Sequence, residues 1–95
     1  MKLVKIRFTR EASRHVSKLH PEVKKIARVA LDELGQNPYR GTELQAELQG
    51  FWSVRAKRYR ILYNINEEDN YIEVLYVGHR RDIFEQFRQI LNKLQ

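Results

Sequence analysis

The sequence contains no cysteine among its 95 residues, which excludes disulfide scaffolds, cysteine-ligated zinc sites and thiol nucleophiles. Its four glycines and two prolines are too few for a collagen-like or low-complexity chain. Phosphate-binding glycine loops and His, Asp or Glu sets at metal spacing are also missing. No apolar run approaches the ~18 residues of a membrane span, and the charged start lacks a signal-peptide core. We therefore expect a single cytoplasmic domain over residues 1–95, without a metal or other cofactor.

Positive charge is what the sequence has in excess. Lysine and arginine number 18 against 12 acidic residues, so the formal net charge is +6. A basic domain of this size indicates an anionic partner, such as nucleic acid, an acidic protein or a membrane surface. The cations form two clusters, Arg55, Lys57, Arg58 and Arg60, and then His79, Arg80 and Arg81.

The first half of the chain predicts a strand followed by two helices. Residues alternate in type over Leu3–Phe8, which is typical of a strand with one buried side. Thr9 can cap a short helix, and His20–Pro21 interrupts the helical pattern because the residue before proline disfavours helical backbone. A second helix follows with apolar residues at helical spacing up to Leu34, and Gly35 is expected to end it.

The second half predicts three strands and a terminal helix. Residues 37–50 are irregular, with Leu44 and Leu48 as apolar anchors. The predicted strands are Phe51–Ala56, Tyr59–Ile65 and Tyr71–Val77. Gly78 is expected to stop the last strand, and an amphipathic helix follows over Ile83–Leu94. The order β-α-α-β-β-β-α predicts an α+β fold, with two N-terminal helices packed on one antiparallel sheet.

Lys57 and Arg58 are expected to form the loop of a hairpin. In that register Arg55 lies directly opposite Arg60, a like-charge pairing that costs ~0.2–1 kcal/mol relative to a neutral pair. A sequence selected for stability alone would avoid this pairing, so we interpret it as a sign of a bound anion. Two-residue turns prefer Asn-Gly or Asp-Gly, and a longer loop would shift the register.

The same register divides the strands into two faces. The outward face carries Ser53, Arg55, Arg60 and Leu62, and the core face carries Trp52, Val54, Ala56, Tyr59, Ile61 and Tyr63. We expect Val16, Ile26, Ala30 and Leu34 of the two helices to cover the core face. The residues expected to be buried there are Trp52, Val54, Ile61, Tyr63, Val74 and Tyr76.

Three basic segments are expected to meet at one end of the sheet. The strand Tyr59–Ile65 is antiparallel to both of its neighbours, so its start lies beside their ends. Arg60 therefore lies near Arg55 on one side and near His79 and Arg80 on the other. A charge cluster is often a solvated surface, but three converging segments favour an anion site.

Two stretches resemble a known family. Residues 51–63 read FWSVRAKRYRILY, and residues 77–84 read VGHRRDIF. Both are similar to the RelE/ParE superfamily, the toxins of bacterial and archaeal type II toxin–antitoxin systems. The beginning of the chain, with HPEV at the turn between its helices, also resembles this family, so the resemblance covers essentially the whole chain.

The resemblance implies one of three functions. RelE-like members enter the ribosomal A site and cleave messenger RNA by attack of a 2′-hydroxyl on the adjacent phosphate, whereas ParE-like members inhibit DNA gyrase without catalysis. A remnant that binds RNA or its partner without activity is the third. We rank them in this order because the basic strand face favours the nuclease. The implied partners are a cognate antitoxin, the ribosome and messenger RNA, with no membrane.

For a nuclease, the resemblance also implies site residues. The catalytic ones are Arg55, Arg60 and Arg80, and Phe84 is implied to bind RNA. The basic clusters add His79 to the catalytic residues and Lys57, Arg58 and Arg81 to the RNA-binding ones. Ser53 stands where some RelE-type toxins have a catalytic lysine, and Phe84 where many have a tyrosine. Guanidinium groups match phosphate oxygens bidentately, but arginine is a poor general base. The base is therefore His79, whose side-chain type titrates near neutral pH, or Lys57, or a group of the ribosome.

The antitoxin is expected to bind through an acidic or amphipathic tail. Such a tail would cover the sheet or displace the Ile83–Leu94 helix, because that helix has an apolar stripe and is terminal. A helix that stays packed in the free toxin is the alternative.

Overall fold

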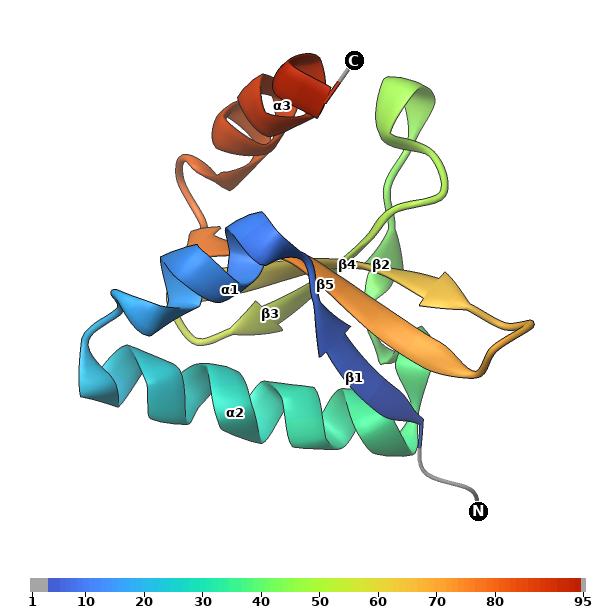
Figure 1. The fold of residues 1–95 in the computed structure, drawn as a ribbon, viewed down its shortest axis with the longest axis horizontal. Helices are drawn as coiled ribbons and strands as arrows, with labels where there is room; N and C mark the ends of the chain where they lie inside the picture. Colours follow the sequence, from blue (N-terminus) through green and yellow to red (C-terminus); the bar gives the residue numbers. More distant parts are fainter. Residues whose placement is uncertain (1–3, 95) are drawn as a thin grey trace.

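The computed structural model describes residues 4–94. Its elements are β1 (Lys5–Phe8), α1 (Arg10–Ser17), α2 (Pro21–Gln36), the 3-10 helix η1 (Pro38–Arg40), β2 (Thr42–Glu43), the 3-10 helix η2 (Ala46–Leu48), β3 (Trp52–Ala56), β4 (Tyr59–Asn66), β5 (Tyr71–His79) and α3 (Ile83–Leu94). The strands form one sheet in the order β1-β5-β4-β3-β2. In Figure 1, α2 runs along one side of this sheet and α3 lies on the other. Leu3, the predicted start of the first strand, lies outside the described residues.

The α+β fold and the order of its main elements are confirmed, but the sheet is mixed rather than purely antiparallel. β1 pairs in parallel with β5, with Lys5 opposite Tyr71 and Phe8 opposite Val74. Parallel neighbours need a long crossover, which the segment from α1 to β4 supplies. Alternation of residue types shows which side of a strand is buried, but it does not identify the neighbouring strand or its direction. The segment predicted as irregular also contains the short strand β2, which pairs with β3.

The ends of the helices follow local hydrogen bonds. Thr9 caps α1 as predicted, and its Oγ1 accepts a bond of 3.1 Å from the Ala12 N–H. The prediction that Gly35 ends α2 is wrong, because the helix continues to Gln36. Gly35 is buried, and its carbonyl accepts a bond of 2.9 Å from the Val4 N–H. The Gly35 carbonyl therefore ties the last turn of α2 to the residue before β1.

One face of the sheet packs against α1 and α2 and forms the larger core, the helix face. The fully buried residues Ile61, Tyr63 and Val74 lie in it. The buried residues of this core are Ala12, Ala27, Ala30, Leu34, Val54, Ala56, Ile61, Tyr63, Ile72, Val74 and Val77, with Val16, Ile26 and Trp52 packed against them. The predicted burial of the hairpin against the helices is thus confirmed for Val54, Ile61, Tyr63 and Val74, whereas Trp52 is only half-buried and Tyr76 packs on the other face.

The opposite face, the α3 face, holds a second and smaller core. Leu62, Tyr76, Ile83 and Phe87 are buried in it together with Leu48. The predicted anchor Leu48 is therefore confirmed, and the terminal helix packs on the sheet in the free chain. Ser53 is also buried, so this face is not the open outward surface that alternation predicts. None of the helices in residues 4–94 is both long and apolar enough to cross a membrane.

A β-bulge explains the different position of Tyr76. Leu62 pairs with Tyr76, whereas the next residue of β4, Tyr63, pairs with Val74, so Leu75 is the extra residue of β5. An extra residue shifts the alternation of side chains along a strand. Val74 and Val77 therefore share the helix face, while Tyr76 packs on the α3 face. The strand also runs through Gly78, which was predicted to stop it, and ends at His79.

Candidate anion site

The two basic clusters meet at the end of the sheet where β3 ends, β4 starts and β5 ends. Arg55 lies opposite Arg60, as predicted, and on the other side Arg60 lies opposite Gly78. The hairpin turn is the predicted pair of residues, with Lys57 at a positive φ of 56°. Beyond β5, the Arg80 N–H donates a bond of 3.0 Å to the Arg58 carbonyl. The backbone therefore brings the three predicted segments together.

The side chains of the paired arginines point to different partners. Arg60 is half-buried, and its Nη1 donates a bond of 2.9 Å to Ser53 Oγ on the α3 face. Arg55 is exposed, and its Nε donates a bond of 3.3 Å to the Lys57 carbonyl. The two guanidinium groups of this like-charge pair therefore bond to different acceptors. The arrangement leaves the other donors of Arg60 available to a ligand.

Gly78, the partner of Arg60 across the strands, makes room for the Tyr76 ring. A Cβ atom at this position would lie 2.6 Å from Cε2 of Tyr76, so a larger residue would force the aromatic ring to move. The Tyr76 ring stacks on His15 at 4.7 Å between centroids, and its hydroxyl donates to Gln86 of α3. Burial, with a contribution from the negative charge of Asp82, raises the pKa of Tyr76, so this anchored side chain remains a neutral donor.

His79 is held in one orientation by two neighbours. Its ring meets that of Tyr59 edge to face at 5.8 Å, and its Nδ1 accepts a bond of 3.3 Å from the Arg81 N–H. Because this bond occupies the Nδ1 lone pair, the neutral ring carries its proton on Nε2. In this state His79 offers a hydrogen-bond donor to a ligand rather than a second acceptor.

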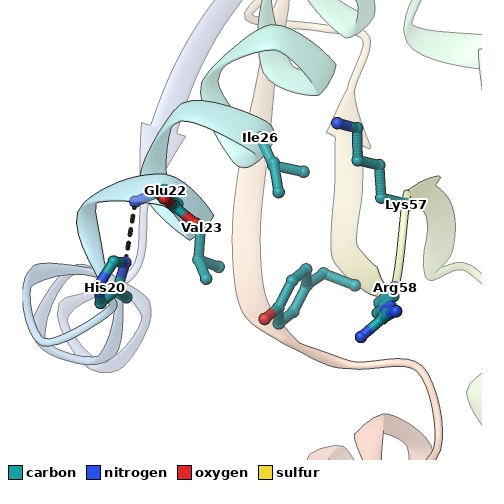
Figure 2. A pocket seen from close by; sticks show the side chains of 7 residues that line it. His20, Glu22, Val23, Ile26, Lys57 and Arg58 are labelled. Atoms are coloured by element: carbon teal, nitrogen blue, oxygen red, sulfur yellow. Dashed lines mark hydrogen bonds between the residues drawn. The ribbon is translucent and has the colours of Figure 1, made fainter.

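Lys57 and Arg58 lie on the α2 side of the hairpin. They border a hairpin groove of about 460 Å³, which is lined by His20, Glu22, Val23, Ile26, Lys57, Arg58 and Tyr59. Figure 2 shows these two cations across from Val23 and Ile26. The start of α2 adds no free donor, since Glu22 N–H bonds to His20 Nδ1 and the next two N–H groups bond to the His20 carbonyl.

The predicted site residues are thus distributed over two sides of the sheet end. Arg55 lines a second groove, of about 390 Å³, together with Lys57 and residues of α2 such as Val29. Arg80 and Arg81 are exposed just beyond β5, and Phe84 is 36% exposed at the start of α3. Within residues 4–94, no three His, Asp or Glu side chains gather as metal ligands.

The sequence did not indicate two features of the site. The sequence places Ser53 on the outward face and at the position of a catalytic lysine in some RelE-type toxins. It does not predict the hydrogen bond to Arg60, which joins residues that are not direct partners across β3 and β4. The sequence predicts Gly78 as a strand end, whereas in the structure the lack of a side chain at Gly78 leaves space for the ring of Tyr76. The one available signal was a small polar residue among the apolar residues of β3.

Comparisons with known proteins agree with this fold. Residues 6–84 match the family described as "ParE toxin of type II toxin-antitoxin system, parDE". The chain is 38% identical over 81 residues to Toxin RelG of Mycobacterium tuberculosis, covering 83% of this chain and 93% of that protein.

Solved structures show the same architecture. A chain of the toxin–antitoxin complex RelBE2 from Mycobacterium tuberculosis has a TM-score of 0.75 and 36% identity, covering 82% of this chain and 99% of that one. A chain of the intact E. coli RelBE toxin–antitoxin complex has a TM-score of 0.69 at 20% identity, covering 80% of this chain and 95% of that one, which is a likeness of fold. The chain belongs to the ParE toxin family, and thus to the RelE/ParE superfamily of toxins of type II toxin–antitoxin systems.

Proposed function

We propose that this toxin is a RelE-like endoribonuclease that cleaves messenger RNA on the ribosome. The observation that carries the proposal is Arg60, which is held on the α3 face by Ser53 and lies opposite the side-chain-free Gly78. His79 and Arg80 follow on the same strand end. A fixed guanidinium with unused N–H donors suits a phosphate, whose oxygens accept its paired N–H groups.

The chemistry follows from charge. The 2′-hydroxyl oxygen bonds to phosphorus while the bond to the 5′-oxygen breaks, which gives a cyclic phosphate and a 5′-hydroxyl. Arg60 and Arg80 stabilise the negative charge that develops on the phosphate oxygens. Arg55, which lines the groove on the α2 side, adds positive charge at the same strand end. His79 donates a hydrogen bond through its Nε2–H to the leaving 5′-oxygen, because its Nδ1 is already occupied, and that oxygen takes its proton from water. The 2′-hydroxyl proton goes to Lys57 or to a ribosomal group, and the ribosome is favoured because Lys57 lines grooves on the α2 side.

The remaining predicted residues bind RNA in this proposal. Lys57, Arg58 and Arg81 supply positive charge around the strand end, and the exposed ring of Phe84 stacks on a base. Such an activity requires the toxin to act in the cytoplasm, where ribosomes translate.

A cognate antitoxin is the proposed protein partner. The similar chains of the RelBE2 and RelBE complexes occur with antitoxins, and the basic surface of this toxin suits an acidic or amphipathic tail. The tail would cover the sheet or displace α3, which is packed through Ile83 and Phe87.

Inhibition of DNA gyrase is the second candidate, favoured by the ParE description of the matching family. The deciding experiment induces the toxin alone and maps RNA 5′ ends on translated and untranslated messages. Cuts within codons of translated messages alone support the nuclease. Intact RNA together with DNA breaks and an SOS response contradicts it and supports gyrase. Intact RNA without growth arrest indicates a binding-only remnant.

A further inference from the structure

Ser53 is a buried polar side chain in a mostly apolar surrounding. It is 2% exposed and lies in β3, opposite Leu62, a fully buried residue of the α3 face. Burying a hydroxyl group is unfavourable unless it forms a hydrogen bond. An alanine would fill the same position without the free-energy cost of burying a hydroxyl group. Packing alone therefore does not explain why this residue is a serine.

The contact with Arg60 provides this explanation. Ser53 Oγ accepts from Arg60 Nη1 at 2.9 Å, although its direct partner across the strands is Leu62 and that of Arg60 is Arg55. The bond is therefore diagonal and draws the Arg60 guanidinium along the sheet, away from Arg55. It uses one of the five N–H donors of the guanidinium and leaves the others for a ligand.

We propose that Ser53 is a positioning residue, which fixes the Arg60 guanidinium on the α3 face of β3 so that it meets the scissile phosphate. This inference rests on the proposed nuclease function, since it assigns the support of that same site. Ser53 itself does not touch the RNA. Its effect is to give Arg60 one orientation before the substrate arrives, and misplacement of a catalytic group by about 1 Å can lower a rate about 100-fold.

The first test is a double-mutant cycle on RNA cleavage by the purified full chain with ribosomes carrying a translated message. Ser53→Ala should lower the single-turnover rate about 10- to 100-fold, and Ser53→Thr, which keeps the hydroxyl, should recover most of it. In the Arg60→Ala background, Ser53→Ala should cause no further loss. Ser13→Ala, at an exposed serine of α1, is the matched control and should not change the rate.

The second test observes the guanidinium directly and needs no activity. Arginine side-chain nitrogen NMR of the free chain should show slowed rotation for Arg60, which Ser53→Ala should release. Arg55, which bonds to the Lys57 carbonyl instead, serves as the internal control and should not change.

The outcomes of these tests distinguish the positioning role of Ser53 from the proposed nuclease function. Equal rate losses from Ser53→Ala in both backgrounds, or unchanged Arg60 rotation in Ser53→Ala, would overturn the positioning role. Absence of cleavage by the wild-type chain would overturn the proposed function, and the NMR result would still decide whether Ser53 holds Arg60.

Discussion

The two faces of the sheet differ in what they bury. The helix face is covered by α1 and α2 over an apolar core that includes Ile61. The α3 face has a smaller core around Leu62 and includes the hydrogen-bonded pair Ser53 and Arg60. Buried apolar area is the main source of folding free energy, so the helix face provides most of the stability. The α3 face can therefore hold a charged group at a cost that the rest of the molecule offsets.

The largest effect should come from emptying the helix face. Ile61 and Leu62 are adjacent in β4 and both are 0% exposed, so they form a matched pair with one residue on each face. Ile61→Ala should lower the free energy of unfolding by about 2–5 kcal/mol. Leu62→Ala should lower it less and should first reduce hydrogen-exchange protection in α3. Urea denaturation and hydrogen exchange measure both, and equal losses with unchanged α3 protection would contradict the division of roles.

Removing the charge from the α3 face should affect activity more than stability. Arg60→Ala should reduce RNA cleavage about 10²–10³-fold, as expected for loss of a fixed donor to developing charge, and should lower the free energy of unfolding by about 1–3 kcal/mol because the buried Ser53 hydroxyl loses its partner. Arg60→Lys should also lose cleavage, because lysine cannot form the bidentate contact. Lys24→Ala on α2 is the control for net charge. A soluble Arg60→Ala variant with full cleavage would exclude Arg60 from the site.

The helix face should also govern stability at alkaline pH. Burial raises the pKa of Tyr63 to about 12, whereas an unfolded tyrosine titrates near 10. Since the folded state favours the neutral phenol, the free energy of unfolding should fall as pH rises from about 10 to 12. The hydroxyl donates to the Pro38 carbonyl at 2.8 Å and accepts from Gly41 N–H at 3.2 Å.

Tyr63→Phe tests this contribution. It should lower the free energy of unfolding by about 1–3 kcal/mol at neutral pH, because it removes both bonds, and it should make the alkaline decline shallower. Denaturation at several pH values gives the slope. A variant with the wild-type slope would show that other groups cause the decline.

The smallest effect is expected at the rim of the helix face. Arg40 and Glu33 form an ion pair of 3.0 Å with side chains 56% and 46% exposed. Exposed ion pairs contribute about 0–1 kcal/mol, so Glu33→Gln should change the melting temperature little. A loss as large as that of Ile61→Ala would mean that charge, and not apolar burial, holds this face.

The sequence predicted the features that depend on neighbouring residues. The hairpin register of Arg55 and Arg60 and the cap at Thr9 follow from short-range patterns, and both are confirmed. The parallel partner of β1 was not predictable in this way, because the two strands lie far apart in the chain. The same holds for Ser53, since its role depends on which of several nearby side chains Arg60 reaches.

The site residues illustrate the limit further. Convergence of the backbone was predictable from the antiparallel order of three strands, whereas the directions of the side chains were not. Arg55 and Arg60 lie opposite each other in the register that the sequence predicts, and yet their guanidinium groups bond to different acceptors. Side-chain direction at a strand end depends on local acceptors and on the open edge of the sheet, and composition carries no information on either.

The extra residue in β5 has a consequence for how this chain can vary. Leu75 has no partner in β4, so the alternation of side chains along β5 shifts by one residue at this point. The part of the strand before Leu75 completes the larger core, and the part after it leads to the cations. Val74, before the bulge, pairs with Tyr63, and Gly78, after it, pairs with Arg60. A deletion of Leu75 would make Val74 and Tyr76 consecutive opposite Tyr63 and Leu62, which is the pairing that they already have, so Tyr76 to His79 would keep their sides. The bulge thus absorbs one residue of chain length, and loss of that residue would leave both the hydrophobic pairing and the basic end of the strand in place.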